Sequence, residues 1–216
     1  LNAVSGFFGQ YFVEISKVHG AVPKVLVVPW GKSVRPDQVK DALKEDNYKA
    51  VTVTHVETST GVMNPIKEIG EIVKEYSDAF YIVDAVCSLG GIEVRVDDWN
   101  IDVCASGSQK CIGVPPGLAL LSVSDKVLKH LEARKSPVRF WYGDLRNWLP
   151  VMRDPSKYSS TLGPLKWKGF RVGHMGNVSQ SDIMSTVAAI EATLRHLGYH
   201  FSYGAGLKAA QEKMLM

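Results

Sequence analysis

The chain has 216 residues, of which 45% are hydrophobic and 22% are charged, and its formal net charge is +3. These proportions are typical of a folded globular protein, and the length suffices for one large domain or two small ones. The small charge argues against a nucleic-acid partner, and no apolar run approaches the roughly 20 residues that a membrane-spanning helix needs. Three cysteines, Cys87, Cys104 and Cys111, form no CxxC pair, which predicts a reducing, cytoplasmic compartment.

Short apolar runs alternate with helical patterns along the chain. Runs with the composition of strands are Lys24–Val28, Ala50–Thr54, Phe80–Val83, Asp102–Ser106 and Gly117–Val123, and the first of them has the composition of a buried strand. Helical patterns are Pro36–Lys44, Pro65–Tyr76 and Asn177–Leu197, of which the last ends before Gly198. This alternation predicts βαβ units, and therefore an α/β fold in which helices cover a mainly parallel sheet.

Polar or glycine-rich clusters follow three consecutive predicted strands. They are Thr54–Gly61, Asp84–Gly91 and Ser106–Lys110. In a parallel sheet of this kind, ligands bind beyond the carboxyl ends of the strands. Any one cluster alone would be an ordinary loop, but three at one edge predict a binding site.

Lys110 and Asp84 carry the most specific chemistry of these clusters. Lys110 directly follows a strand, where its amine can form a Schiff base with a carbonyl, although a surface lysine is the commoner outcome. Asp84 closes another strand and is equally compatible with a turn cap. Together they form the pair that a pyridoxal phosphate (PLP) enzyme needs, because the lysine holds the aldehyde and the aspartate keeps the pyridine nitrogen protonated.

Other side chains suit a cofactor or a substrate, and each has an ordinary structural alternative. The hydroxyls of Thr58–Gly61 can bind a cofactor or cap a turn. Arg171 can bind a carboxylate through its planar fork, or form an internal salt bridge. Phe7 and Phe8 can pack in the core, or one ring can stack on a planar cofactor. No P-loop, HExxH or GxSxG pattern occurs, and no spacing of His, Cys and carboxylates indicates a metal site.

Taken together, these segments resemble the class V aminotransferases of PLP fold type I, in the alanine–glyoxylate and serine–pyruvate aminotransferase branch. The resemblance rests on HVETSTG (His55–Gly61), VDAVCSLGG (Val83–Gly91) and SGSQK (Ser106–Lys110) with the following PPG (Pro115–Gly117). It implies a three-layer α/β/α PLP-binding domain with a mainly parallel sheet over residues 1–161. Residues 162–216 would be the remnant of a small C-terminal α+β domain.

The resemblance implies PLP as the cofactor and gives individual residues a role. Lys110 would form the Schiff base and move a proton, and Asp84 would pair with the pyridine nitrogen. Arg171 would bind the substrate α-carboxylate. Contacts with the cofactor are implied for Phe8, Thr58, Val86 and Gln109, and for Tyr158 and Thr161 reaching the phosphate in the neighbouring subunit of a homodimer with shared active sites.

The implied activity is transamination between a small amino acid, serine or alanine, and a small 2-oxo acid, glyoxylate or pyruvate. Two alternatives stay open: a cysteine desulfurase or related class V lyase, and a non-catalytic α/β fragment. A desulfurase would be expected to have histidine before the lysine, whereas Gln109 precedes Lys110 here. This residue favours the aminotransferase.

The sequence also departs from the family pattern in two places. The family has a glycine- and serine-rich, phosphate-binding region that would precede Leu1. It also continues after Thr161 with a block of domain size, on the order of a hundred residues, before the pattern resumes near Phe170. Neither region is found in this sequence, and two interpretations stay open: the sequence joins segments that are separate in a longer chain, or the block is truly deleted between Thr161 and Leu162.

Overall fold

The computed structural model describes residues 1–138, 140–154 and 179–214. The chain forms two compact units, Leu1–Arg146 and Asn147–Met216. The domain boundary that we expected at residue 161, and the expected join between Thr161 and Leu162, lie outside the described residues.

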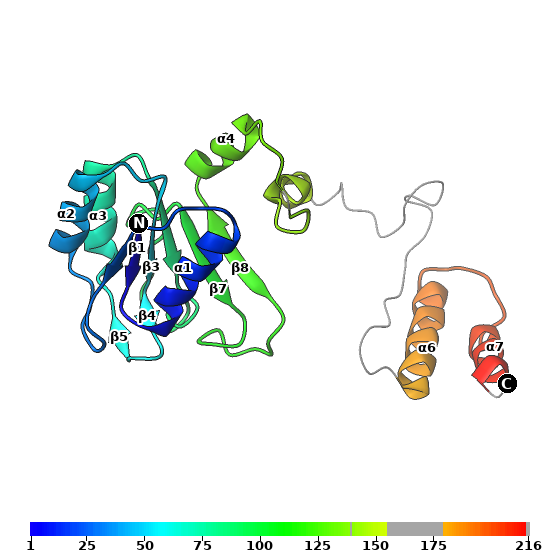
Figure 1. Cartoon of the computed structure of the whole chain (residues 1–216). Coiled ribbons are helices and arrows are strands. Elements are labelled where there is room, and N and C mark those ends of the chain that lie inside the picture. The colour runs from blue at the N-terminus through cyan, green and yellow to red at the C-terminus, as the bar shows by residue number, and fades with distance from the viewer. Residues whose placement is uncertain (139, 155–178, 215–216) are drawn as a thin grey trace. The chain divides into compact units, whose positions relative to one another are not determined.

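The first unit is built on a six-stranded sheet with the strand order β2-β1-β3-β6-β7-β8 (Figure 1). Neighbouring strands are parallel from β2 to β7, and β8 runs antiparallel to β7 at the edge. A separate hairpin of β4 and β5 follows β3. The bounds of the strands are β1 (Asn2–Val4), β2 (Val25–Val27), β3 (Ala50–Thr54), β4 (Val56–Glu57), β5 (Val62–Met63), β6 (Phe80–Asp84), β7 (Val103–Gly107) and β8 (Ala119–Val123).

The register of the central strands brings their carboxyl ends to one edge of the sheet. Thr54, the last residue of β3, pairs with Asp84, the last residue of β6. Asp84 in turn pairs with Ala105 of β7. The polar clusters that follow these strands therefore leave the sheet side by side.

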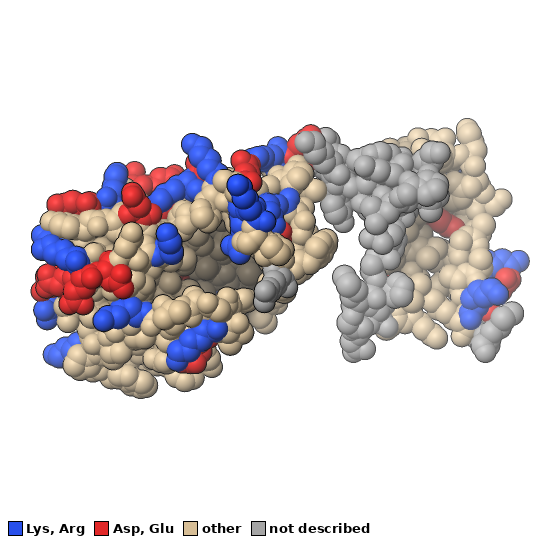
Figure 2. Space-filling view, turned by 45° about the horizontal axis from the view of Figure 1, so that its top comes forward, with Lys and Arg blue, Asp and Glu red and all other residues tan. Residues whose placement is uncertain are grey.

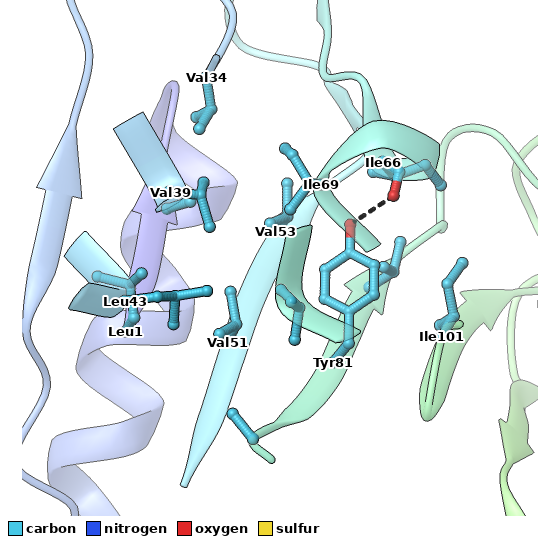
Figure 3. Packing of buried hydrophobic residues seen from close by; sticks show 14 of the residues in the cluster. Leu1, Val34, Val39, Leu43, Val51, Val53, Ile66, Ile69, Tyr81 and Ile101 are labelled. Atoms are coloured by element: carbon cyan, nitrogen blue, oxygen red, sulfur yellow. Dashed lines mark hydrogen bonds between the residues drawn. The ribbon is translucent and has the colours of Figure 1, made fainter. Parts of the chain in front are cut away.

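Helices cover both faces of this sheet. On one face α2 and α3 pack against each other and against the strands (Figure 3). Val51 and Val53 point to this face, as expected for alternate residues of a strand. Val4 and Val13 do not belong to the hydrophobic cluster on this face. They are buried where α1 packs on β1 and β3. The helix bounds are α1 (Phe7–Val18), α2 (Pro36–Glu45), α3 (Ile66–Tyr76) and α4 (Asp125–Ala133).

Tyr81 is the largest of the fully buried side chains and joins β6 to α3. Its hydroxyl donates a hydrogen bond to the carbonyl oxygen of Ile66 at 2.9 Å (Figure 3). Burial raises the pKa of this hydroxyl well above its ordinary value. The bond satisfies a polar group that would otherwise be costly inside the core.

These elements confirm the predicted α/β fold with a mainly parallel sheet, with one correction. Lys24–Val28 was expected to be a buried strand, but β2 lies at the sheet edge and Val27 is 60% exposed. Of the two alternatives for Phe7 and Phe8, the structure excludes packing in the core, because both lie in the first turn of α1 and are 49% and 37% exposed. The short strand β1 was not predicted.

Charged side chains of both signs are interspersed on the face of the first unit that Figure 2 shows. This distribution agrees with the small formal net charge of +3.

The described part of the second unit consists of helices. The long helix α6 (Gln180–His196) begins at Ser179, which exchanges hydrogen bonds with Asp182 as a capping box. It ends before Gly198, which adopts a φ of +81° that favours glycine. The other helices are α5 (Leu149–Arg153) and α7 (Ala205–Met214), and no helix in the described ranges is long and apolar enough to cross a membrane.

Candidate active site

The loops after β4, β6 and β7 contact one another at the carboxyl edge of the sheet. The hydroxyl oxygen of Thr58 lies 2.9 Å from the thiol sulfur of Cys87. The thiol of Cys111 donates a hydrogen bond to the carbonyl oxygen of Cys87 at 3.5 Å. Because Cys111 directly follows Lys110, these contacts bring the loops of Thr58, Asp84 and Lys110 together, as their positions at strand ends predicted.

Asp84 ends β6 as a half-buried carboxylate. Its Oδ1 accepts a hydrogen bond from the amide of Val86 at 2.9 Å, so it caps the turn that follows the strand. Burial raises the pKa of Asp84, and the negative charge of Glu57 raises it further, while the Val86 amide opposes both. Among the described residues no cation forms a salt bridge with this carboxylate, so a positive ligand group would relieve the penalty of burying it.

Lys110 lies in a tight loop that fixes its backbone and leaves its side chain exposed. The loop closes with a hydrogen bond from the amide of Gly113 to the carbonyl of Lys110 at 2.9 Å. The hydroxyl of Ser108 anchors the loop by donating to the carbonyl of Pro115 at 2.7 Å. Within the described ranges no hydrogen bond or ion pair engages the Lys110 ammonium group. An amine presented in this way is available to a carbonyl ligand.

The expected cofactor contacts differ in exposure. Thr58 and Gln109 are exposed, and Val86 is half-buried. The ring of Phe8 packs edge-on against Phe7, with the ring centroids 5.8 Å apart. All four lie in the first turn of α1 or in loops at the carboxyl edge, and their contacts with a cofactor stay predictions.

Glu57 is a residue of this edge whose importance the sequence did not reveal. It has no exposed surface, and its carboxylate accepts hydrogen bonds from the amides of Phe8, Gly9 and Ser59 at 3.3, 3.0 and 3.1 Å. Burial alone would raise its pKa, but the hydroxyl of Ser59 and these amides hold the pKa below its ordinary value. The acidic residue was visible inside the HVETSTG motif, but its partner helix was not predicted.

Three expected site residues fall outside the described residues. They are Tyr158, Thr161 and Arg171, which lie within residues 155–178. Their proposed roles toward the phosphate and the substrate carboxylate therefore stay predictions.

The residues at this edge fit PLP. Asp84 would supply a carboxylate for the pyridine nitrogen, and Lys110 would supply an amine for the aldehyde. In addition His55 Nδ1 and Ser88 Oγ are buried and have no hydrogen-bond partner among the described residues. Buried polar atoms normally have a hydrogen-bond partner. These two atoms can therefore form hydrogen bonds with a ligand close to the ends of β3 and β6. This donor set combines a base, an anion and unpaired polar atoms, as a polar, aromatic cofactor requires.

Comparison with known proteins identifies the family. The model of the family "Aminotransferase class-V" matches residues 11–138. An uncharacterized aminotransferase of Methanocaldococcus jannaschii is 51% identical over an alignment that covers all of this chain and 78% of the relative. The alignment extends over 301 residues, although the chain has 216. Part of the relative within the aligned span therefore has no counterpart here.

Two crystal structures have a similar fold. The alanine–glyoxylate aminotransferase of Nostoc sp. superposes with a TM-score of 0.68 and 30% identity over 75% of this chain and 42% of its own. The ureidoglycine–glyoxylate aminotransferase of Bacillus subtilis superposes with a TM-score of 0.67 and 25% identity over 99% of this chain and 78% of its own. The family model covers more than half of the sequence, and the chain therefore belongs to the class V aminotransferases, whose cofactor is PLP.

Proposed function

We propose that this protein transfers an amino group between a small amino acid, serine or alanine, and a small 2-oxo acid, glyoxylate or pyruvate. One observation carries the proposal: Asp84 ends β6, Lys110 follows the neighbouring strand β7, and their loops meet through the contact of Cys111 with Cys87. The acceptor is suggested by the two similar crystal structures, both named as glyoxylate aminotransferases.

Bound PLP supplies an electron sink for the electron pair that is left when the substrate loses its α-proton. Asp84 holds a proton on the pyridine nitrogen, because a half-buried carboxylate is stabilised by a neighbouring positive charge. Lys110 would hold the aldehyde of the cofactor through its amine. The same amine would move the proton between the substrate Cα and the cofactor C4′.

The remaining residues bind and orient the cofactor and the substrate. Thr58 donates a hydrogen bond to the cofactor, Val86 and Phe8 pack on its ring, and Gln109 contacts its phosphate. In the proposed homodimer, Tyr158 and Thr161 reach the phosphate of the neighbouring subunit. Arg171 binds the substrate α-carboxylate, because a guanidinium group matches a carboxylate with two parallel hydrogen bonds.

The test begins with cofactor uptake by the full chain. We expect the purified protein to take up PLP and to show an absorbance band near the visible edge. The variant Lys110→Ala should lose this band and keep its far-ultraviolet circular dichroism. The matched control is Lys49→Ala, which removes another exposed lysine. Lys49 directly precedes β3 and therefore lies at the amino ends of the parallel strands, away from the site.

Product analysis then tests the reaction. Alanine with glyoxylate should give pyruvate and glycine, and serine with pyruvate should give hydroxypyruvate and alanine. A folded chain that never takes up PLP would contradict the proposal and favour a binding fragment. A chain that takes up PLP and releases sulfide from cysteine, without amino transfer, would favour the desulfurase alternative.

A further inference from the structure

Glu57 joins two segments that the proposed function places against the cofactor. Its Oε2 accepts a hydrogen bond from the amide of Gly9 at 3.0 Å, and its Oε1 accepts one from the amide of Phe8 at 3.3 Å. Both amides belong to the first turn of α1, which carries the ring of Phe8. On the other side, Glu57 directly precedes Thr58 in the chain.

Ser59 completes the connection. Its hydroxyl donates a hydrogen bond to Glu57 Oε1 at 2.6 Å and accepts one from the amide of Phe7 at 2.9 Å. The loop therefore holds the start of α1 through two side chains rather than one. The fit leaves little space, because a Cβ atom placed on Gly6 would lie 2.5 Å from Glu57 Cγ and 2.6 Å from Ser59 Oγ.

We propose that Glu57 is a positioning residue of the cofactor site, which fixes the turn that carries Phe8 to the loop that carries Thr58. The inference rests on the proposed function, because the roles of Phe8 and Thr58 toward PLP belong to it. The positive end of α1 and the four hydrogen bonds stabilise the negative charge of Glu57, and no cation among the described residues forms a salt bridge with it.

The charge of Glu57 also reaches the second carboxylate of the site. The negative charge of Glu57 is one cause of the raised pKa of Asp84, after burial. Two carboxylates near one edge give a negative potential, which favours a protonated pyridine nitrogen at Asp84. Glu57 therefore acts on the site both through geometry and through charge.

The rival explanation is that Glu57 only caps a helix. The chain offers a matched control in Glu191, which is 6% exposed and accepts hydrogen bonds from the amides of Gly204 and Gly206 at 2.8 and 2.6 Å, at the start of α7. The variants Glu57→Gln and Glu191→Gln each remove the charge of a buried carboxylate at a helix N-terminus. They keep the size of the side chain and one acceptor oxygen.

The experiment uses the full chain, freed of cofactor and titrated with PLP while its tryptophan fluorescence is followed. We expect Glu57→Gln to weaken PLP binding about tenfold, the effect of losing one charge-assisted hydrogen bond. The circular dichroism band of the bound cofactor should also decrease. Glu191→Gln should bind PLP as the unaltered chain does, although both variants should unfold at a lower temperature.

The outcomes separate the inference from the function on which it rests. If the unaltered chain does not bind PLP, the proposed function fails. If the unaltered chain binds PLP and Glu57→Gln binds it equally well, with an unchanged cofactor band, Glu57 is only a helix cap and the inference is overturned. A third variant, Ser59→Ala, should weaken PLP binding less than Glu57→Gln, because it keeps the carboxylate.

Discussion

The hydroxyl of Thr58 and the thiol of Cys87 lie 2.9 Å apart although 29 positions separate them in the sequence. The contact ties the loop after β4 to the loop after β6. It brings the proposed cofactor contact of Thr58 next to the segment that begins with Asp84. The carbonyl of Cys87 also accepts the hydrogen bond from Cys111, so Cys87, in the loop after β6, contacts both the loop of Thr58 and the loop of Lys110.

Loss of the Thr58 hydroxyl should weaken cofactor binding. We expect Thr58→Val to raise the dissociation constant of PLP about fivefold, since one hydrogen bond contributes about 1 kcal/mol net. The control is Thr60→Val in the same loop, which removes a hydrogen bond of Thr60 to the carbonyl of Ser5 at 3.3 Å. Fluorescence titration measures both variants. Equal weakening by the two would show that loop order, and not the Thr58 hydroxyl, controls binding.

Asp84 should make stability depend on pH in the chain without PLP. Burial raises its folded pKa above the ordinary 3.8, so the folded state holds this proton more tightly than the unfolded state does. The protonated Asp84 carboxyl therefore stabilises the folded state at low pH. This contribution to the free energy of unfolding is lost as the pH rises from about 3.8 through the folded pKa. We expect Asp84→Asn to be more stable than the unaltered chain at neutral pH.

The difference in the free energy of unfolding between Asp84→Asn and the unaltered chain should shrink as the pH falls toward 3.8, because Asp84 then becomes protonated in both the folded and the unfolded state. Denaturant unfolding at a series of pH values measures it. The exposed Asp78 gives the control, because Asp78→Asn should change stability little at any pH. A destabilised Asp84→Asn at neutral pH would contradict the prediction.

The same variant should lose about two orders of magnitude of transamination rate, because it removes a charge that stabilises the transition state.

A methyl group on Gly6 should disturb the start of α1. In Gly6→Ala the new atom would meet Glu57 Cγ at 2.5 Å and Ser59 Oγ at 2.6 Å, so the loop and the helix must move apart. We expect a loss of about 1–3 kcal/mol in the free energy of unfolding. Gln10→Ala, at an exposed position of the same helix, should change it little. Unaltered stability of Gly6→Ala would show that this junction adapts freely.

Tyr81 gives a stability prediction that is independent of the cofactor. Tyr81→Phe removes the hydroxyl that bonds to the carbonyl of Ile66 at 2.9 Å. We expect the free energy of unfolding to fall by about 1 kcal/mol while the affinity for PLP stays the same. Tyr199→Phe is the control, since Tyr199 is 64% exposed. A change in PLP affinity for Tyr81→Phe would show that the core beneath β6 transmits strain to Asp84.

Much of the fold could be predicted from local patterns. Ala50–Thr54 forms β3 with the predicted bounds, and the helix predicted over Pro65–Tyr76 forms α3 from Ile66, with Pro65 as its N-cap. Such elements can be predicted from the sequence because side chains alternate between the two faces of a strand and return to the same face of a helix every three to four residues. β1 was missed because its three residues, Asn2–Val4, begin with a polar side chain and form no continuous apolar run like that of β2 (Val25–Val27).

α1 was missed for another reason. Several of its apolar side chains, among them Tyr11 and Ile15, are 49% and 53% exposed. Its pattern therefore does not separate an apolar core face from a polar solvent face, which is the signal that predicts a surface helix. Without α1, nothing in the sequence assigned a partner to Glu57.

The motifs alone thus identified the family of this protein, and they predicted that a lysine and an aspartate at strand ends carry its chemistry. Residue types and short spacings carry that information, because each strand and each loop is specified locally. The role of Glu57 depends on contacts with residues as far as 49 positions away, and the meeting of Thr58 with Cys87 depends on the register of β3 against β6. Such contacts form only when the sheet assembles, because pairing and burial between distant segments follow from the packing of the whole domain and not from any single stretch of chain.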